Sequence, residues 1–255
     1  MSKKKKILIL GIIILLLIFS IIFILSSLNK NKIAVLGYHG IVPKAENNFH
    51  DNLIVDQEKF EKELKLLKNM GYHSMTLDEF YCWKTGQCKK NHKSVLITFD
   101  DGYINNYKYA FDLLKKYDMK AVVFFVGKYS LSNSDIHMDI NLIKSILEKY
   151  KNIEFASHSY DMHSPKPREY DEVNNDIQKM KKITNSKYYA YPHGDYTDGY
   201  IKALKDNDYI MAFTFGPGKE HRKSDIKDDN YKIPRLNISN DMSLLKFVLR
   251  MILPM

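Results

Sequence analysis

The sequence of 255 residues contains only two cysteines, one tryptophan and seven prolines, and its first 32 positions hold no acidic residue. Two cysteines exclude a fold that depends on a disulfide framework, as in small secreted domains. Hydrophobic residues make up 45% of the chain and charged residues 27%, close to the globular average. The length therefore suits one large domain with an ample hydrophobic core, and α/β barrels of this size commonly form one.

The positive charge is concentrated at one end of the chain. The formal net charge is +9, but six lysines lie within the first 32 residues, where no carboxylate balances them. Without this segment, 33 basic and 30 acidic residues remain, a net charge of +3. A nucleic-acid-binding protein would carry its basic residues on the folded domain, so the sequence predicts no nucleic-acid partner.

Residues 7–28 form a long apolar segment without a charged side chain. As an α-helix this segment would extend about 33 Å, enough to cross the hydrocarbon core of a bilayer. A cleavable signal peptide would have a shorter apolar region followed by small residues such as Ala-x-Ala, and no such site follows here. The segment is therefore predicted to be an uncleaved transmembrane signal anchor.

The lysines around the anchor predict its orientation. Four lysines precede it and two follow it, and positive residues favour the cytoplasmic side. Residues 1–6 are then a cytoplasmic tail, residues 29–32 a linker and residues 33–255 an extracellular domain at the cell membrane.

Cys82 and Cys88 are separated by five residues. In an oxidising compartment such a pair can close a small loop. The alternative is two free thiols in a surface segment, and the spacing is not a metal motif.

Strand and helix patterns alternate through the rest of the chain. Apolar residues recur at helical spacing before Gly71, which suits a helix C-terminus, and residues 76–79 read as a capping box. A helix is also expected at residues 103–117. Strands are predicted at residues 33–39, 94–99, 121–126, 153–157, 188–191, 209–214 and 232–236. About seven strand–helix units predict a parallel sheet closed into a barrel, with the active site at the carboxyl ends of the strands.

Polar residues follow two of these strands. Asp100 and Asp101 come directly after residues 94–99, and His158 and His163 follow residues 153–157. One carboxylate could bind a metal while the other moves protons, and two neutral imidazoles with a carboxylate suit zinc-like metals. Taken separately, the aspartates could form an ordinary turn and the histidines an exposed loop. Their shared position at one end of the barrel favours a site.

Two further segments lie at strand ends. His39 ends the first strand and could donate a proton, or it could be a buried, hydrogen-bonded histidine. Residues 191–194, Tyr-Pro-His-Gly, form a tight loop around His193 whose backbone N–H groups could face a site, or a plain connecting turn.

Together these motifs resemble the NodB-type polysaccharide deacetylases, carbohydrate esterase family 4. Residues 96–103, Leu-Ile-Thr-Phe-Asp-Asp-Gly-Tyr, look like the first family signature, residues 158–163 like its metal-binding histidine motif, and residues 191–194 like its loop motif. The motifs occur in family order and span residues 33–236. The resemblance implies a distorted (β/α) barrel and hydrolysis of N-acetyl groups.

The departures from the family pattern are informative. Four residues rather than three separate His158 from His163, which resembles the subgroup acting on poly-β-1,6-N-acetylglucosamine. The late family histidine is missing from residues 233–238, Ile-Pro-Arg-Leu-Asn-Ile. In that subgroup an early histidine takes the acid role, which points to His39. The arginine that usually precedes the loop motif is also missing, and Arg235 is expected to orient Asp100 instead.

The resemblance implies one divalent metal, zinc or alternatively cobalt, nickel or iron, bound by Asp101, His158 and His163. It also implies Asp100 as general base, His39 as general acid, and a backbone N–H near His193 for the oxyanion.

The expected partners are an N-acetylated extracellular polysaccharide, the membrane and the exopolysaccharide synthesis machinery. The alternatives are a peptidoglycan N-deacetylase, with the same chemistry on another polymer, and a catalytically inactive glycan-binding module. The complete Asp–Asp–His–His set argues against the inactive module.

Overall fold

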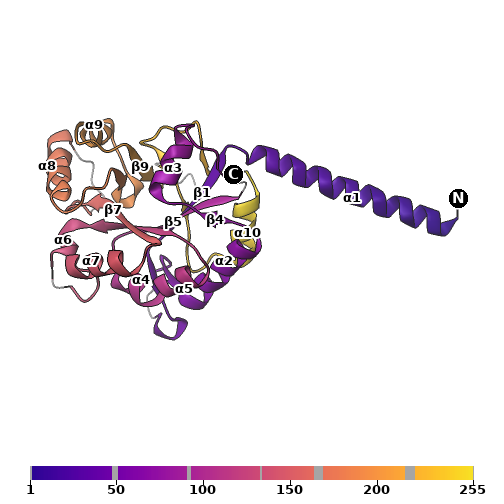
Figure 1. Ribbon diagram of the computed structural model, residues 1–255, viewed down its shortest axis with the longest axis horizontal. Helices are drawn as coiled ribbons and strands as arrows, with labels where there is room; N and C mark the ends of the chain where they lie inside the picture. Colours follow the sequence, from indigo (N-terminus) through magenta and orange to yellow (C-terminus); the bar gives the residue numbers. More distant parts are fainter. Residues whose placement is uncertain are drawn as a thin grey trace.

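The computed structural model describes residues 2–47, 51–90, 93–132, 134–163, 169–215 and 222–254. Helix α1 (Lys3–Leu28) projects from the folded domain as a single rod (Figure 1). Its mean hydropathy reaches 3.5 and none of its apolar window is buried, so it is long and apolar enough to cross a membrane.

The central sheet is built from parallel strands. Strands such as β5 (Ser94–Phe99) and β6 (Ala121–Val126) are continuous apolar runs that are buried along their whole length, which is typical of a parallel sheet covered on both faces. The main strands follow one another around the sheet in chain order: β1 (Lys32–Tyr38), β5, β6, β7 (Ile153–Ser159), β8 (Tyr188–Ala190) and β9 (Met211–Thr214). Short β4 (His73–Ser74) pairs with β5, and β10 (Ser224–Asp225) pairs antiparallel with β1.

One short segment closes the sheet into a barrel. Strand β11 (Ile233–Pro234) pairs with β9, and β12 (Leu236–Asn237) pairs with β1. Arg235 lies between these two strands and is fully buried. The predicted distorted barrel is confirmed, and its seam lies at residues 233–237.

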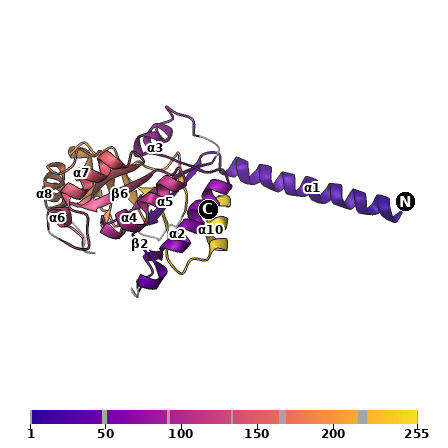
Figure 2. The same ribbon diagram turned by 60° about the horizontal axis from the view of Figure 1, so that its bottom comes forward.

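Helices surround this barrel, with α8 and α9 on one side and α2 and α10 on the side nearest α1 (Figures 1 and 2). The helices are α2 (Gln57–Asn69), α3 (Leu77–Lys84), α4 (Ile104–Tyr109), α5 (Phe111–Lys116), α6 (Gly127–Ser130), α7 (Ile140–Lys149), α8 (Tyr170–Lys181), α9 (Asp198–Asp206) and α10 (Leu244–Ile252). The described residues also form the 3₁₀ turns η1 (Lys44–Glu46) and η2 (Pro192–Gly194) and the strand pair β2 (Gly40–Val42) and β3 (Ile54–Asp56).

The hydrophobic core is divided into separate clusters, because alternate side chains of a strand belong to different clusters. In β6, Val122 and Phe124 belong to one apolar cluster, whereas Val123 and Phe125 belong to another. Successive strand side chains point to opposite faces, so one set fills the barrel and the other packs beneath the surrounding helices.

Helix α3 covers the amino-terminal end of the barrel. Its Phe80 and Trp83 are buried in the same cluster as the inward-facing side chains of β6. The predicted capping box is present, since Thr76 Oγ1 accepts from the N–H of Glu79 while the Glu79 carboxylate accepts from the N–H of Thr76. Cys82 and Cys88 form a disulfide at the end of this helix.

Some predicted boundaries differ from the structure. The helix expected at residues 103–117 is two helices, α4 and α5, that meet at Ala110. Strand β1 begins at Lys32, one residue earlier than expected. The strand expected at residues 232–236 is divided at Arg235, because each half pairs with a different edge of the sheet.

Candidate active site

A cavity of about 600 Å³ opens where the carboxyl ends of the strands meet. Six of the seven predicted site residues line it: His39, Asp100, Asp101, His158, His163 and His193. The seventh, Arg235, lies behind Asp100. The barrel therefore brings together all the residues that sequence reasoning singled out.

Asp101 lies at the sharp turn that follows β5. Its φ is 69° and that of Gly102 is 78°, so the chain turns through the left-handed region at both residues. The Oδ1 atom of Asp101 lies 3.4 Å from Nε2 of His158 and 3.3 Å from Nε2 of His163. One ligand atom from each of these residues lies within 4.8 Å of the other two. This is the spacing of a three-residue metal centre.

Hydrogen bonding determines which nitrogen of His158 faces the site. Nδ1 donates to the backbone oxygen of Ala190 over 2.7 Å, which leaves Nε2 directed at Asp101. Burial lowers the pKa of His158, but the carboxylates of Asp100 and Asp101 outweigh it and the pKa is raised. Burial likewise acts to raise the pKa of Asp101, and the neighbouring histidines hold it well below its ordinary value.

Asp100 forms a two-pronged ion pair with Arg235. Nη1 of the guanidinium donates to Oδ1 over 2.7 Å, and Nη2 donates to Oδ2 over 2.8 Å. Burial acts to raise the pKa of Asp100, but the guanidinium outweighs it and keeps the carboxyl ionised. Two parallel bonds also hold the carboxylate plane in one orientation.

The surroundings of Arg235 keep its guanidinium in place. Nη1 also donates to Oγ1 of Thr98 over 3.3 Å, and the guanidinium lies 4.0 Å from the ring centre of Phe215. An arginine stacked on an aromatic ring is a favourable pairing. The barrel seam thus supplies a rigid cation beneath the cavity.

His39 lies on the opposite wall from the histidine pair, just after β1. Its ring stacks on Phe215 with the ring centres 6.2 Å apart, and its backbone oxygen accepts from Nδ2 of Asn106. Among the described residues, no partner is found for its buried Nδ1. An imidazole with a spare nitrogen at the cavity wall can carry a proton.

His193 lies in the turn η2 with a φ of 57°. Its ring stacks on His163, with the ring centres 5.1 Å apart. The N–H groups of Gly194 and Asp195 donate to the backbone oxygens of Tyr191 and Pro192. For the N–H of His193 no acceptor is found within the described ranges, so this donor is available to a ligand.

Sequence reasoning missed Tyr103 and Phe215, which both line the cavity. Burial and the neighbouring Asp101 carboxylate raise the pKa of Tyr103, so its hydroxyl stays protonated. In the sequence, its position directly after Asp101 and Gly102 could have marked it as a site residue. No sequence pattern marked Phe215 as a site residue, because its role depends on contacts with His39 and Arg235, which are distant in the chain. A Cβ at Gly37 would lie 2.7 Å from its ring, so the ring occupies the space that this glycine leaves.

Two acidic residues, Asp51 and Asp195, also line the cavity and were not anticipated. Asp51 lies in the loop before β3, far in sequence from the motifs, whereas Asp195 directly follows the loop motif at residues 191–194. Carboxylates at the edge of a polar cavity can accept hydrogen bonds from hydroxyl groups.

Comparison with known proteins points in one direction. The family model described as polysaccharide deacetylase matches residues 87–212. YxkH of Bacillus subtilis, whose name assigns it to the same family, is 31% identical over 218 residues, covering 83% of this chain and 73% of YxkH. The poly-β-1,6-N-acetyl-D-glucosamine N-deacetylase of Staphylococcus epidermidis is 30% identical over 241 residues, covering 83% of this chain and 81% of that protein.

The fold is also similar to a solved structure. The deacetylase PplD of Streptococcus pyogenes superposes with a TM-score of 0.71 at 24% identity, over 86% of this chain and 98% of PplD.

Proposed function

Because this chain belongs to the polysaccharide deacetylase family and is an enzyme of that class, we propose that it removes N-acetyl groups from poly-β-1,6-N-acetylglucosamine outside the cell. The products are acetate and a glucosamine unit in the polymer. The observation that carries the proposal is the Asp101, His158 and His163 cluster, which lies in the same cavity as Asp100.

The donor set of the cluster fits a divalent metal of the zinc type, with cobalt, nickel or iron as alternatives. Among the described residues, Oδ1 of Asp101 is buried without a hydrogen-bond donor, and Nε2 of His158 faces it because Nδ1 is bonded to Ala190. One carboxylate and two imidazoles suit such ions and leave positions for substrate and water. When bound, the ion would polarise the acetyl carbonyl and make a water molecule more acidic.

Different protein groups around the cluster carry out the separate proton transfers of the reaction. Asp100, held ionised and oriented by Arg235, takes a proton from the attacking water, whose oxygen adds to the acetyl carbon. The N–H of His193 stabilises the negative charge that develops on the carbonyl oxygen. His39 then protonates the departing amine as the C–N bond breaks.

The substrate and its linkage are proposed from four features. The relative from Staphylococcus epidermidis is named for the β-1,6-linked polymer. Four residues separate His158 from His163, and residues 233–238 contain no histidine, as expected for that subgroup. Asp51 and Asp195 add hydrogen-bond acceptors beside the cluster, which suits a hydroxyl-rich sugar.

The location is proposed from α1. Its length and hydropathy suit a membrane span, and the lysines before it favour a cytoplasmic amino terminus. Residues 1–6 would then be cytoplasmic, residues 7–28 would cross the membrane and the barrel would lie outside. A deacetylase tethered there would meet the polymer close to the machinery that synthesises it.

The test is acetate release by the full chain in detergent from N-acetylglucosamine oligomers of β-1,6 and β-1,4 linkage. Each assay is run with and without a chelator, followed by readdition of Zn²⁺. We expect faster release from the β-1,6 oligomer, loss of release with the chelator and recovery with Zn²⁺. Faster release from the β-1,4 oligomer would favour a peptidoglycan substrate, and release that survives metal removal would contradict the metal assignment.

A further inference from the structure

A second cavity, of about 370 Å³, lies where α1 joins the barrel. It lies beside the first residues of β1 and β5, so it is at the amino-terminal end of the barrel, opposite the active site. Four lysines line it together with Asn29: Lys32, Lys90, Lys93 and Lys223. We call this cavity and its four lysines the basal lysine pocket.

Among the described residues, the ammonium groups of the pocket contact only neutral oxygens. Lys223 donates to Oδ1 of Asn29 over 2.6 Å and to the backbone oxygen of Met251 over 2.8 Å. Lys90 donates to the backbone oxygen of Asn29 over 3.0 Å and to that of Lys32. Two cationic side chains therefore converge on Asn29, and one of them, Lys223, is only 4% exposed.

The other two lysines are arranged in the same way. Lys32 donates to the backbone oxygen of Pro254 over 2.6 Å, and Lys93 donates to that of Met70 over 2.7 Å. No carboxylate in the described ranges forms an ion pair with any lysine of the pocket. A concentration of positive charge without an anion is costly in a partly buried site.

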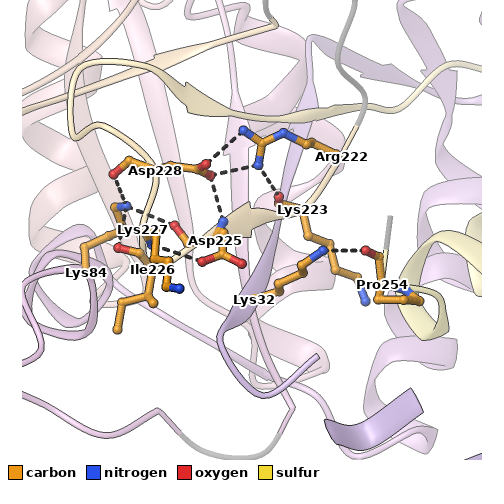
Figure 3. Close-up of polar contacts among 9 residues, drawn as sticks. All are labelled: Lys32, Lys84, Arg222, Lys223, Asp225, Ile226, Lys227, Asp228 and Pro254. Atoms are coloured by element: carbon orange, nitrogen blue, oxygen red, sulfur yellow. Dashed lines mark hydrogen bonds and ion pairs between the residues drawn. The ribbon is translucent and has the colours of Figure 1, made fainter. Parts of the chain in front are cut away.

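The two acidic residues at β10 are engaged elsewhere. Asp225 lies opposite Lys32 in the strand pairing, and its Oδ1 accepts from the backbone N–H of Lys227. Figure 3 shows Asp228 directed at Arg222, with bonds of 2.9 and 2.8 Å to its guanidinium, while Lys32 and Lys223 lie beside Pro254. The carboxylate of Asp228 also accepts from the backbone N–H of Asp225. Asp225 and Asp228 are therefore committed to the β10 turn, and neither forms an ion pair with a lysine of the pocket within the part of the chain that the structure describes.

The pKa values of two pocket lysines are also lowered, as expected for buried and crowded positive charges. Burial lowers the pKa of Lys90 to about 8. Burial and the neighbouring charges of Lys90 and Lys32 lower the pKa of Lys223 to about 8. A bound anion would reverse this repulsion.

The surface next to the pocket is apolar and lies on the same side of the domain as α1. On α10, Leu245, Leu249 and Ile252 are 69%, 42% and 38% exposed, and their spacing places them on one side of the helix. Both views show α10 on the side of the domain from which α1 extends (Figures 1 and 2). Nδ2 of Asn29 donates to the backbone oxygen of Ile252 over 2.8 Å, so this surface is continuous with the end of α1.

We propose that the basal lysine pocket binds the phosphate group of an anionic phospholipid headgroup. The pocket lies directly after the last turn of α1, where a headgroup would be found if α1 spans the bilayer. Leu25, Met251 and Ile252 also line it and offer apolar contacts for the lipid beneath the phosphate. A free phosphate ion would use the lysines but would gain nothing from these apolar groups.

Binding there would orient the enzyme. Strand β1 runs from the pocket towards the active site, and its seven residues span about 23 Å. With the pocket and the exposed side of α10 against the membrane, the catalytic cavity would open away from the lipid. The inference rests on the membrane location proposed for α1 but not on the catalytic roles.

The test uses the full chain in neutral detergent and follows its thermal unfolding midpoint while a short-chain phospholipid is added. The probes are dioctanoyl phosphatidylglycerol, dioctanoyl phosphatidylcholine and inorganic phosphate. The variants are Lys223→Met and the double variant Lys90→Gln/Lys93→Gln, which keeps the more buried Lys223. Lys144→Gln is the control, because Lys144 is an exposed lysine on α7, away from the pocket.

Phosphatidylglycerol should raise the midpoint at concentrations well below those needed for phosphatidylcholine. Each pocket variant should weaken this response roughly tenfold, the loss expected for a hydrogen bond to a charged group, and Lys144→Gln should respond as wild type. Equal responses to the two lipids, or unchanged responses in both pocket variants, would overturn the proposal. A response to inorganic phosphate as strong as that to phosphatidylglycerol would rule out lipid as the ligand. Acetate release from soluble oligomers, measured on the same samples, reports separately on the proposed function.

Discussion

Arg235 and Asp100 are 135 positions apart in the sequence, and their side chains meet through two parallel hydrogen bonds inside the barrel. They meet because Arg235 occupies the single position between β11 and β12, where the last segment of the sheet crosses from β9 to β1. The residue that closes the barrel therefore also orients the carboxylate proposed as the general base.

Arg235→Lys should lower kcat while leaving the metal content unchanged. A lysine ammonium cannot form two parallel bonds to Asp100, and the loss of a charge-assisted bond predicts a reduction of roughly tenfold to a hundredfold. Acetate release and metal analysis of the purified full chain measure both quantities. Arg222→Lys is the matched control, because Arg222 makes a similar paired contact with Asp228 at the far end of the barrel. An unchanged kcat would show that Asp100 does not depend on this contact.

Alanine substitution of Asp101, His158 or His163 should each reduce bound metal, since one ligand atom from each lies within 4.8 Å of the others. The metal content of the full chain, measured by inductively coupled plasma mass spectrometry, is the readout. His73→Ala removes an exposed histidine near the opposite end of the barrel and should bind metal normally. Full occupancy in all three site variants would refute the ligand assignment.

Asp100→Asn and His39→Ala should both retain metal and lose turnover by about 10²- to 10⁴-fold, the usual contribution of general acid–base catalysis. Neither residue belongs to the proposed ligand set, so the loss should appear in kcat. His73→Ala again serves as the control. Near-normal turnover in His39→Ala would mean that another group protonates the leaving amine.

Replacing Cys82 and Cys88 by serine should reduce the free energy of unfolding by up to about 2 kcal/mol, the loop entropy for so short a loop. Activity on soluble oligomers should persist, because the disulfide lies at the end of α3 and the active site at the other end of the barrel. Urea unfolding monitored by circular dichroism measures the first effect. Thiol titration of protein from native membranes checks the bond, and two reactive thiols per chain would argue against it.

In detergent without anionic lipid, the Lys223→Met variant should be more stable than the wild type, and this advantage should be largest at pH 7. The pKa of Lys223 is about 8 in the folded protein, whereas an unfolded lysine titrates near pH 10.4. Between these values the unfolded chain binds more protons, so wild-type stability rises with pH. The difference in unfolding midpoint between variant and wild type should therefore shrink from pH 7 to pH 10. A constant difference would contradict the lowered pKa, and Lys144→Met should show no such trend.

Local patterns in the sequence were sufficient for much of the fold. The strand–helix alternation predicted the parallel barrel, and the capping box at Thr76 was predicted correctly because a helix cap involves residues only three positions apart. The motifs around Asp100 and His158 could be assigned to one end of the barrel, because the carboxyl ends of parallel strands meet there. The split of residues 103–117 into α4 and α5 was missed, since the pattern of apolar residues continues across Ala110.

The sequence by itself determined the main strands and helices, the apolar segment at residues 7–28 and the ends of the strands that carry the motifs, because hydrophobic periodicity and short motifs depend on near neighbours. Only the tertiary structure decided that residues 233–237 close the barrel, that Phe215 stacks on both Arg235 and His39, and that four dispersed lysines share one pocket. These relationships join residues far apart in the chain, and they exist only once the parallel strands have closed into a ring. Local patterns predicted a barrel, but none of them shows which residues make its closing contacts.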